Sequence, residues 1–129
     1  MQLTEKAIKL IEGKNFGYFA TVMKDGSPQV TPVWVDHEGK DYILVNTALG
    51  RTKQKNAKRK SEVAIAIADA SNQYEQVSVR GVVTEQTTKG ADEHIDKLAK
   101  KYLGKERYPY RSPNEERVIL KIMPEHISE

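Results

Sequence analysis

The sequence predicts a mainly β fold: a small barrel of six antiparallel strands with flanking helices, in one domain that covers residues 1–129. Six short segments rich in β-branched and aromatic residues alternate with turn signals, which is typical of consecutive strands. Only three segments show signals of a helix. A chain of 129 residues is long enough for one hydrophobic core. An open sheet would leave exposed edges, so we expect the strands to close into a barrel.

The first predicted element is a short amphipathic helix that ends at Gly13. Thr4 is placed to be its N-cap, because a hydroxyl there can accept a hydrogen bond from a free backbone N–H. Leu3 and Ile8 have the spacing of a hydrophobic staple around that cap. We therefore expect this helix to lie with one face on an apolar surface.

The predicted strands are, in chain order, residues 16–23, 29–37, 41–47, 62–69, 76–86 and 117–123, the last of them stopped by Pro124. Turns at 24–28 and 38–40 join the first three into a meander. Pro32 cannot donate a ladder hydrogen bond, which indicates a sheet edge or a bulge there. Residues 62–69 are apolar on both faces, so both faces should be covered. Gly81 indicates a bulge or a close backbone approach.

Two further helices are predicted between strands. Residues 51–60 form the first, with Gly50 or Thr52 near its start. Residues 87–103 form the second, because their apolar side chains recur at helical spacing. Gly104 follows them as a plausible C′ residue, since glycine tolerates the left-handed conformation that ends many helices.

The segment from Asn46 to Lys60 is the strongest candidate for a binding site. A buried-looking strand ends in Asn46 and Thr47, Gly50 follows, and six of the ten residues 51–60 are basic. A strand that opens into a glycine turn and a helix start often holds a phosphate, because free N–H groups and the helix dipole favour an anion. Two other interpretations stay open: a solvated basic helix face, and a helix-entry cap at Asn46.

Composition excludes several classes of function. There is no cysteine, so disulfides, thiolate metal sites and cysteine nucleophiles are excluded. The three histidines lie far apart in sequence, which predicts no metal site. No apolar run approaches the roughly 20 residues of a membrane span. The first ten residues lack the apolar core of a signal peptide, so a cytoplasmic protein with no membrane partner is expected.

Several short motifs occur together in a characteristic order: Phe19-Ala20-Thr21, Gly26-Ser27-Pro28, Pro32-Val33-Trp34, Gly50-Arg51-Thr52-Lys53 with Asn56, and Val79-Arg80-Gly81. In these motifs the chain resembles the pyridoxamine 5′-phosphate oxidase-like, FMN-binding split β-barrels, and within them the small deazaflavin-dependent branch that uses coenzyme F420. The resemblance covers nearly the whole chain. It implies a homodimer with FMN or F420 at the subunit interface. The true oxidases have a longer C-terminal region, which argues against vitamin B6 oxidation here.

The resemblance also implies which residues contact the cofactor. They are Thr31, Pro32, Val33 and Trp34 beside the ring, Asn46 and Thr47 near the ring and ribityl chain, Arg51, Thr52 and Lys53 at the phosphate, Asn56 from the same motif, and Gln73 and Tyr74 from the partner subunit. For Trp34, packing in the core is an equally good interpretation.

The choice between F420 and FMN depends on the helix after the phosphate motif. F420 continues past its phosphate into a lactyl and oligoglutamate tail with several negative charges. Lys55 and Arg59 are four residues apart, so on a helix they share a face and can line one path for that tail. This arrangement predicts a modest preference for F420, unless these side chains only solubilise the surface.

The predicted activity is hydride transfer between the cofactor ring and a small unsaturated or quinone-like substrate. The redox chemistry then belongs to the cofactor. No acid or base is assigned; a proton can come from solvent or from Tyr108 or Tyr110, in a loop that can also be a plain surface loop. The alternatives are a carrier that binds the cofactor without catalysis, and a nucleic-acid-binding barrel. The basic segment lacks interleaved aromatic residues, which disfavours nucleic acid.

Overall fold

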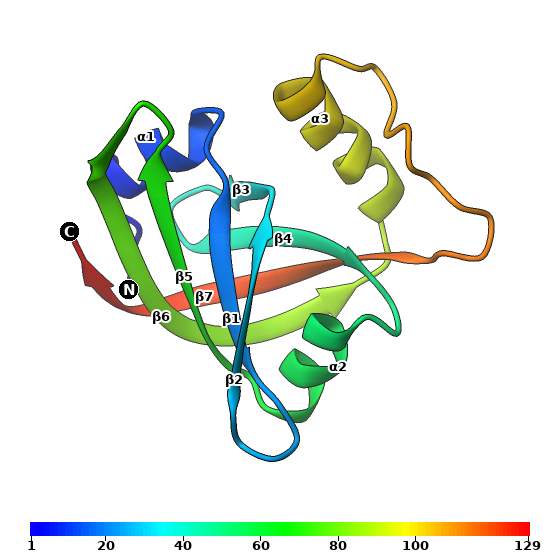
Figure 1. The fold of residues 1–129 in the computed structure, drawn as a ribbon, viewed down its shortest axis with the longest axis horizontal. Coiled ribbons are helices and arrows are strands. Elements are labelled where there is room, and N and C mark those ends of the chain that lie inside the picture. The colour runs from blue at the N-terminus through cyan, green and yellow to red at the C-terminus, as the bar shows by residue number, and fades with distance from the viewer.

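The computed structural model describes residues 1–129 and contains three α-helices and seven β-strands (Figure 1). In chain order they are α1 (Glu5–Glu12), β1 (Gly17–Val22), β2 (Pro28–Val33), β3 (Val35–Glu38), β4 (Tyr42–Ala48), α2 (Thr52–Arg59), β5 (Glu62–Asp69), β6 (Asn72–Thr87), α3 (Ala91–Leu103) and β7 (Arg117–Ser128). The prediction of a mainly β fold is confirmed. None of the three helices has the length and apolar character that a membrane crossing requires.

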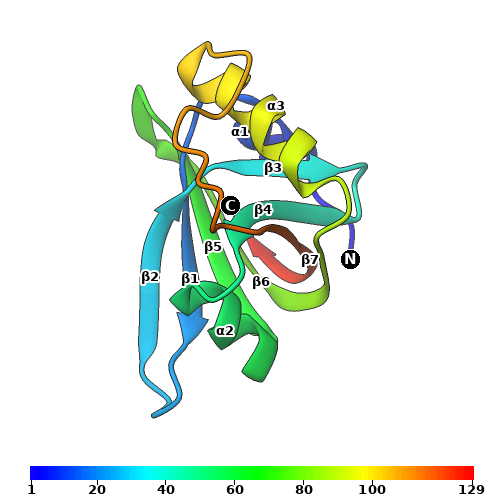
Figure 2. The same cartoon turned by 90° about the vertical axis from the view of Figure 1, so that its right-hand side faces the viewer.

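All seven strands belong to one antiparallel sheet with the order β2-β1-β5-β6-β7-β4-β3. The strands at its two ends, β2 and β3, are separated in the chain only by Trp34. The sheet must therefore curl until its ends meet, and Figure 2 shows β2 and β3 joined across the barrel opening. The chain connects β2 directly to β3, but the two strands form no hydrogen-bonded ladder with each other. The barrel is therefore split between them.

The predicted count of six strands is wrong by one. Residues 29–37 were expected to form one strand, but the ladder changes partner at Trp34: β2 pairs with β1, whereas β3 pairs with β4. The edge predicted at Pro32 is confirmed, because β2 pairs on one side only.

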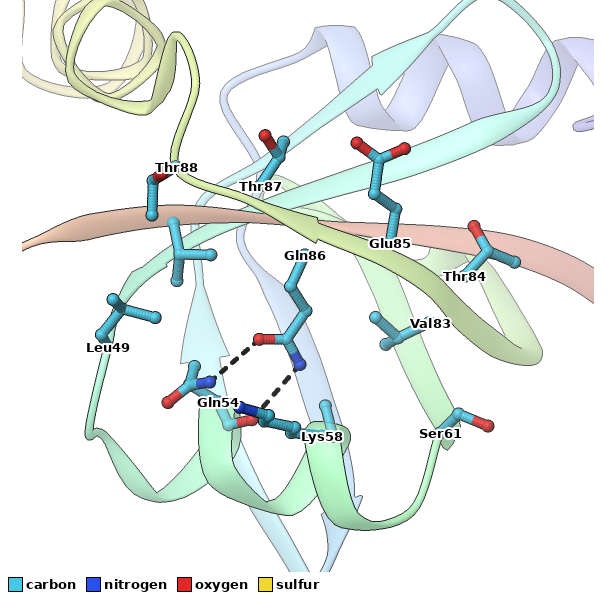
Figure 3. Close-up of a pocket in the computed structure, with 12 residues that line it drawn as sticks. Leu49, Gln54, Lys58, Ser61, Val83, Thr84, Glu85, Gln86, Thr87 and Thr88 are labelled. Carbon is cyan, nitrogen blue, oxygen red and sulfur yellow. Dashed lines mark hydrogen bonds between the residues drawn. The ribbon is translucent and has the colours of Figure 1, made fainter.

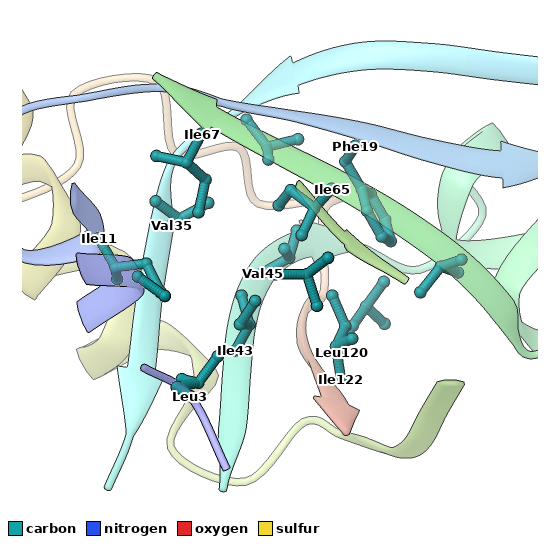
Figure 4. Packing of buried hydrophobic residues seen from close by; sticks show 14 of the residues in the cluster. Leu3, Ile11, Phe19, Val35, Ile43, Val45, Ile65, Ile67, Leu120 and Ile122 are labelled. Atoms are coloured by element: carbon teal, nitrogen blue, oxygen red, sulfur yellow. The ribbon is translucent and has the colours of Figure 1, made fainter. Parts of the chain in front are cut away.

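The interior of the barrel holds one cluster of 18 buried apolar residues (Figure 4). The inward side chains of neighbouring strands alternate with outward ones, so Phe19, Ile65 and Leu120 meet in the centre. β5 has the two apolar faces that were predicted. Val63, Ile65 and Ile67 are buried, while the alanines between them remain half-buried on the outer face.

Helices α1 and α2 lie at opposite ends of the barrel, and α3 packs outside against β4 and β7 (Figures 1 and 2). The predicted cap of α1 is confirmed: Thr4 Oγ1 accepts a hydrogen bond from Ala7 N at 3.1 Å. Gly104 ends α3 with φ of 69°, as predicted. The predicted start of that helix at residue 87 is wrong, because β6 continues through Thr87 and Gly90 precedes α3.

The long strands β6 and β7 bend past each other at Gly81. The pairing register shifts between Arg80 and Gly81, and an added Cβ at Gly81 would lie 2.2 Å from Met123 O. Both the predicted bulge and the predicted close approach are confirmed. The prediction that Pro124 stops the last strand is wrong: β7 runs on to Ser128, since the bulge accommodates a residue that has no N–H to donate.

Candidate functional site

A pocket of about 190 Å³ lies where the break between β2 and β3, the end of β4 and the start of α2 come together. Seven residues that the sequence placed at a cofactor line it: Pro32, Val33, Trp34, Asn46, Thr47, Arg51 and Lys53. The fold adds Phe16, Ile95, Tyr108, Tyr110 and Arg117. Segments that are distant in sequence therefore converge on one aromatic and cationic hollow.

Three cations surround the polar side of this pocket. Arg51 is the N-cap residue of α2 and Lys53 lies in its first turn, where no side chain caps the helix. Arg117, at the start of β7, is only 5% exposed. Burial lowers the pKa of Lys53, and the charges of Arg51 and Arg117 lower it further. Positive charge is thus concentrated here beyond what the chain itself neutralises, which favours an anion.

One carboxylate belongs to this cation cluster. Arg51 Nη2 donates to Glu115 Oε2 at 2.9 Å, and Arg117 Nη1 donates to Glu115 Oε1. Burial favours the neutral form of Glu115, but the hydrogen bonds and charges of Arg117 and Arg51 outweigh it and hold the pKa of this carboxyl below its usual range. Glu115 is therefore an ionised bridge between the two guanidinium groups.

Asn46 holds Arg117 in place from the other side. Its Oδ1 accepts from Arg117 Nε at 2.9 Å, and its Nδ2 donates to Ala91 O at 2.9 Å and lies 3.1 Å from His94 Nδ1. His94 Nε2 in turn lies 3.0 Å from Asp36 Oδ2. Asn46 does not cap α2, so the interpretation as a helix-entry cap is wrong. The side chain instead connects the pocket to α3.

Two buried hydroxyls, one of them in the pocket, have no hydrogen-bond partner within the chain. They are the Oγ1 atoms of Thr31 and Thr47, and no other buried side-chain oxygen or nitrogen is in this position. Thr47 lines the pocket and is 1% exposed. A buried hydroxyl without a partner costs roughly 1–3 kcal/mol, so it usually meets water or a ligand. Both residues were predicted to contact a cofactor, and a polar cofactor with a phosphate fits this donor set.

The apolar wall of the pocket is an ordered stack of aromatic rings. Trp34 stacks on Tyr102 with ring centroids 5.2 Å apart and planes within 5°. Tyr108 meets Trp34 edge-on at 5.9 Å, and Tyr110 meets Tyr108 at 5.6 Å. Trp34 is thus both packed and pocket-lining, so the two interpretations of this residue are compatible.

The segment that carries Tyr108 is tied to α3. Asp96 Oδ1 accepts from Tyr108 N at 2.8 Å and from Arg111 Nη2 at 2.6 Å. Arg111 also pairs with Asp92 at 3.3 Å. The interpretation of residues 105–116 as a plain surface loop therefore misses how firmly this segment is positioned over the pocket.

Seven predicted residues do not line the pocket: Thr31, Thr52, Lys55, Asn56, Arg59, Gln73 and Tyr74. Asn56 is buried and donates to Thr21 Oγ1 at 3.0 Å, while Arg59 donates to Val22 O at 2.6 Å. Both side chains thereby hold α2 against β1. Lys55 is exposed, and Tyr74 near the start of β6 is 94% exposed. Within one chain, Gln73 and Tyr74 do not reach the pocket.

A larger hollow of about 520 Å³ lies between α2 and the end of β6 (Figure 3). Gln54 Nε2 donates to Gln86 Oε1 at 3.0 Å across its floor, and Gln86 Nε2 donates back to Gln54 O at 3.4 Å. Its amides are therefore satisfied by each other, and none of the cations of the first pocket lines it. We assign the candidate site to the smaller pocket on this chemical ground.

The family model for pyridoxamine 5′-phosphate oxidase matches residues 3–129. The chain belongs to this family. A solved F420 reductase is 29% identical, with a TM-score of 0.80, and the match covers 93% of this chain and 94% of that one. A Lactobacillus delbrueckii protein classed with the pyridoxamine 5′-phosphate oxidases is 26% identical, with a TM-score of 0.69 and coverage of 99% and 94%.

A Listeria innocua structure of the same class, 18% identical over 96% of this chain and 94% of its own, shares the fold with a TM-score of 0.69. No curated protein sequence matches the chain. The resemblance of the sequence to the pyridoxamine 5′-phosphate oxidase family, with an F420-type branch among its structures, is therefore confirmed. The chain is a split-barrel protein of this flavin- and deazaflavin-binding family.

The structure also shows what sequence reasoning missed. Arg117 and Glu115 complete the cation cluster, yet they lie more than 60 residues after Arg51. A signal did exist: Arg117 directly precedes the apolar run Val118-Ile119-Leu120, a position where a charged side chain needs a specific partner.

Proposed function

We propose that the protein is an oxidoreductase that transfers hydride between coenzyme F420 or FMN and a small unsaturated or quinone-like substrate. The observation that carries the proposal is the pocket in which three cations, the unpartnered hydroxyl of Thr47 and a stacked aromatic wall converge. The similarity to a solved F420 reductase supports it. A cytoplasmic location is part of the same proposal.

In this proposal Arg51, Lys53 and Arg117 hold the phosphate by charge-assisted hydrogen bonds. The uncapped first turn of α2 adds backbone N–H donors and the helix dipole. Trp34 shields one side of the ring, and the hydroxyls of Thr31 and Thr47 donate to its polar edge. The bound cofactor would supply the hydride chemistry. The chain's own residues bind it, orient it and exclude water from one face.

We further propose that the functional unit is a homodimer. The pocket of about 190 Å³ is smaller than the roughly 300–1,000 Å³ of complete ligand sites, which supports completion by a second chain. The outer sheet face is apolar: Tyr18 is 51% exposed and Val30 62% exposed, beside the half-buried alanines of β5. Gln73 and Tyr74 of the partner subunit would then reach the cofactor. Sedimentation that shows only a 14.6 kDa species at micromolar concentration would contradict the dimer.

The cofactor site is tested by the double change Arg51→Ala, Lys53→Ala. Hydrogen bonds to charged groups contribute about 1.5–3 kcal/mol each, so losing two should weaken FMN or F420 binding by on the order of a hundredfold or more. The matched control is Lys40→Ala, Lys60→Ala, which removes the same charge from exposed positions that line neither this pocket nor the hollow along α2. Equal affinities in a folded double variant and in wild type would remove Arg51 and Lys53 from the site.

The preference for F420 rests on a second, open hollow beside the pocket. Lys55, Lys58 and Arg59 line it together, so its cations can accompany an anionic tail. Because Arg59 also holds β1, Lys55→Ala is the cleaner test. We expect this change to weaken F420 binding, by a factor that shrinks with added salt, and to leave FMN binding nearly unchanged. Equal losses for both cofactors, or none, would make FMN the better assignment.

A hydride-transfer assay distinguishes an oxidoreductase from a protein that only carries the cofactor. The loaded protein should pass hydride to, or accept it from, a quinone or an activated alkene, followed by the absorbance of the cofactor. Tight binding without turnover on any such compound would instead identify a protein that carries or sequesters the cofactor.

A further inference from the structure

The candidate site contains one carboxylate, Glu115, among its three cations. Glu115 bridges Arg51 and Arg117 with both of its oxygens, and its side chain is 18% exposed. It comes from the segment between α3 and β7, whereas Arg51 is the N-cap residue of α2 and Arg117 is the first residue of β7. The proposed phosphate site therefore contains a carboxylate that already engages two of its three cations.

Glu115 is hydrogen-bonded to the guanidinium group of Arg117, which is itself held in place. Arg117 is 5% exposed and is fixed from behind by Asn46, which accepts from its Nε at 2.9 Å and, through its backbone oxygen, from Nη2 at 3.4 Å. The Arg117 guanidinium also lies 5.1 Å from the centroid of the Tyr108 ring. An anion that enters the pocket must accordingly share this guanidinium with the Glu115 carboxylate.

The charges of the cluster and of the ligand phosphate determine how strongly the site binds a given anion. The cluster of Arg51, Lys53, Arg117 and Glu115 has a net charge of +2, from three cations and one carboxylate. A phosphomonoester such as FMN carries about two negative charges at neutral pH, because its second pKa is about 6. A phosphodiester carries one. Each additional charge on the ligand adds a repulsion from Glu115 at close range in a partly desolvated site.

We infer that Glu115 is a specificity-determining residue that weakens binding of the doubly charged phosphomonoester of FMN more than binding of the singly charged phosphodiester of a deazaflavin. The inference rests on the proposed function and deepens it, since it names the residue that shifts the phosphate preference of the site toward the phosphodiester. It is independent of the tail path along Lys55. Glu115 touches the phosphate-binding arginines and not the reacting ring, so it is not a catalytic residue.

The test is the change in affinity on Glu115→Gln for three ligands that differ in phosphate charge. Riboflavin has no phosphate, F420 has a singly charged phosphodiester and FMN a doubly charged phosphomonoester. Removing the Glu115 charge should raise the affinity about tenfold for each unit of negative charge on the phosphate. We therefore expect no change in affinity for riboflavin, about a tenfold gain for F420 and about a hundredfold gain for FMN. Titration calorimetry or quenching of ring fluorescence measures all three without any turnover.

The matched control is Glu116→Gln. It removes the same charge one residue later, from an exposed side chain that forms no ion pair, so it should change no affinity by more than about twofold. Melting temperatures of both variants establish that they are folded. Glu115→Asp keeps the charge and should keep the wild-type preference.

Two results overturn the inference alone: equal gains for FMN and F420, or a loss of FMN affinity in Glu115→Gln, which would mean that Glu115 only positions the arginines. If neither wild type nor Glu115→Gln binds any of the three ligands, the proposed cofactor site is refuted, and the inference with it. A gain graded by phosphate charge, absent from Glu116→Gln, supports it.

Discussion

Tyr102 couples the fold to the wall of the candidate pocket, and its hydroxyl can be removed alone. The Tyr102 hydroxyl donates to Asn15 O at 2.6 Å and accepts from Val35 N at 3.1 Å. The ring stacks on Trp34. Tyr102→Phe keeps that stacking and deletes only the bridge between Asn15, two residues before β1, and Val35 at the start of β3.

The expected loss of stability follows from the two groups left behind. A buried donor or acceptor without a partner costs about 1–3 kcal/mol, so the two groups together should destabilise Tyr102→Phe by about 2–6 kcal/mol. With an unfolding entropy of about 2.1 cal/mol/K per residue over 129 residues, this corresponds to a melting temperature lower by about 7–22 °C. Tyr74→Phe is the control, because the same atom is removed from a side chain that is 94% exposed.

The loss should also depend on pH. Burial, reinforced by the charge of Asp36 and opposed by the Val35 N–H, raises the pKa of Tyr102 to about 12. The unfolded value is about 10, so this contribution to stability is complete below pH 10 and is lost as the pH rises through 12. The gap between wild type and variant should therefore narrow by about 1.4 kcal/mol at pH 11.

Urea denaturation of wild type, Tyr102→Phe and Tyr74→Phe at pH 7.5 and at pH 11 measures both effects. A loss below about 1 kcal/mol at the lower pH, or a loss equal to that of Tyr74→Phe, would refute the bridging role. A gap that stays constant up to pH 11 would refute the linkage to the phenol.

Two further predictions concern the strand crossing and the acidic partner of α3. Gly81→Ala should destabilise the protein by about 1–3 kcal/mol or more, because the new methyl would meet Met123 O; unchanged urea unfolding would contradict this. Burial favours the neutral form of Asp36, but hydrogen bonds, led by that with His94 and including that with Lys97, hold its pKa well below the usual range. This stabilisation exists above about pH 4, the unfolded value, and is lost as the pH falls. Asp36→Asn should thus cost about 1–3 kcal/mol at pH 7, and this cost should begin to shrink as the pH falls below about 4, as measured by thermal unfolding between pH 7 and pH 3.

Most of the fold could be predicted because local signals agree with the tertiary structure. The cap at Thr4, the turn glycine Gly104 and the apolar alternation of 62–69 all depend on near neighbours in sequence. The break at Trp34 could not be predicted in this way. Alternation continues through residues 33–35, and only pairing with two distant strands makes the chain change partner there.

The part of the candidate site that comes from one contiguous segment, residues 46–60, could be predicted from the sequence. Arg51 and Lys53 follow a strand and start a helix, and the structure places both at the pocket. Glu115 and Arg117 arrive from β7 and the segment before it, a pairing set by the sheet and invisible to spacing. Arg59, a basic residue predicted to meet a ligand, also donates to Val22 O, a structural contact that its spacing in the sequence does not reveal.

The single residue between β2 and β3 also limits how the pocket can adapt. Consecutive Cα atoms are about 3.8 Å apart, so the two rims of the split sheet stay tethered at Trp34 at nearly fixed separation. That side of the pocket cannot widen without breaking a ladder. Room for a bulkier compound must come from the segment of Tyr108 and Tyr110, which is attached to α3 through the carboxylates of Asp92 and Asp96. Substitutions meant to change the substrate range should therefore begin in residues 105–116. Trp34, which fixes the separation of β2 and β3, should be left unchanged.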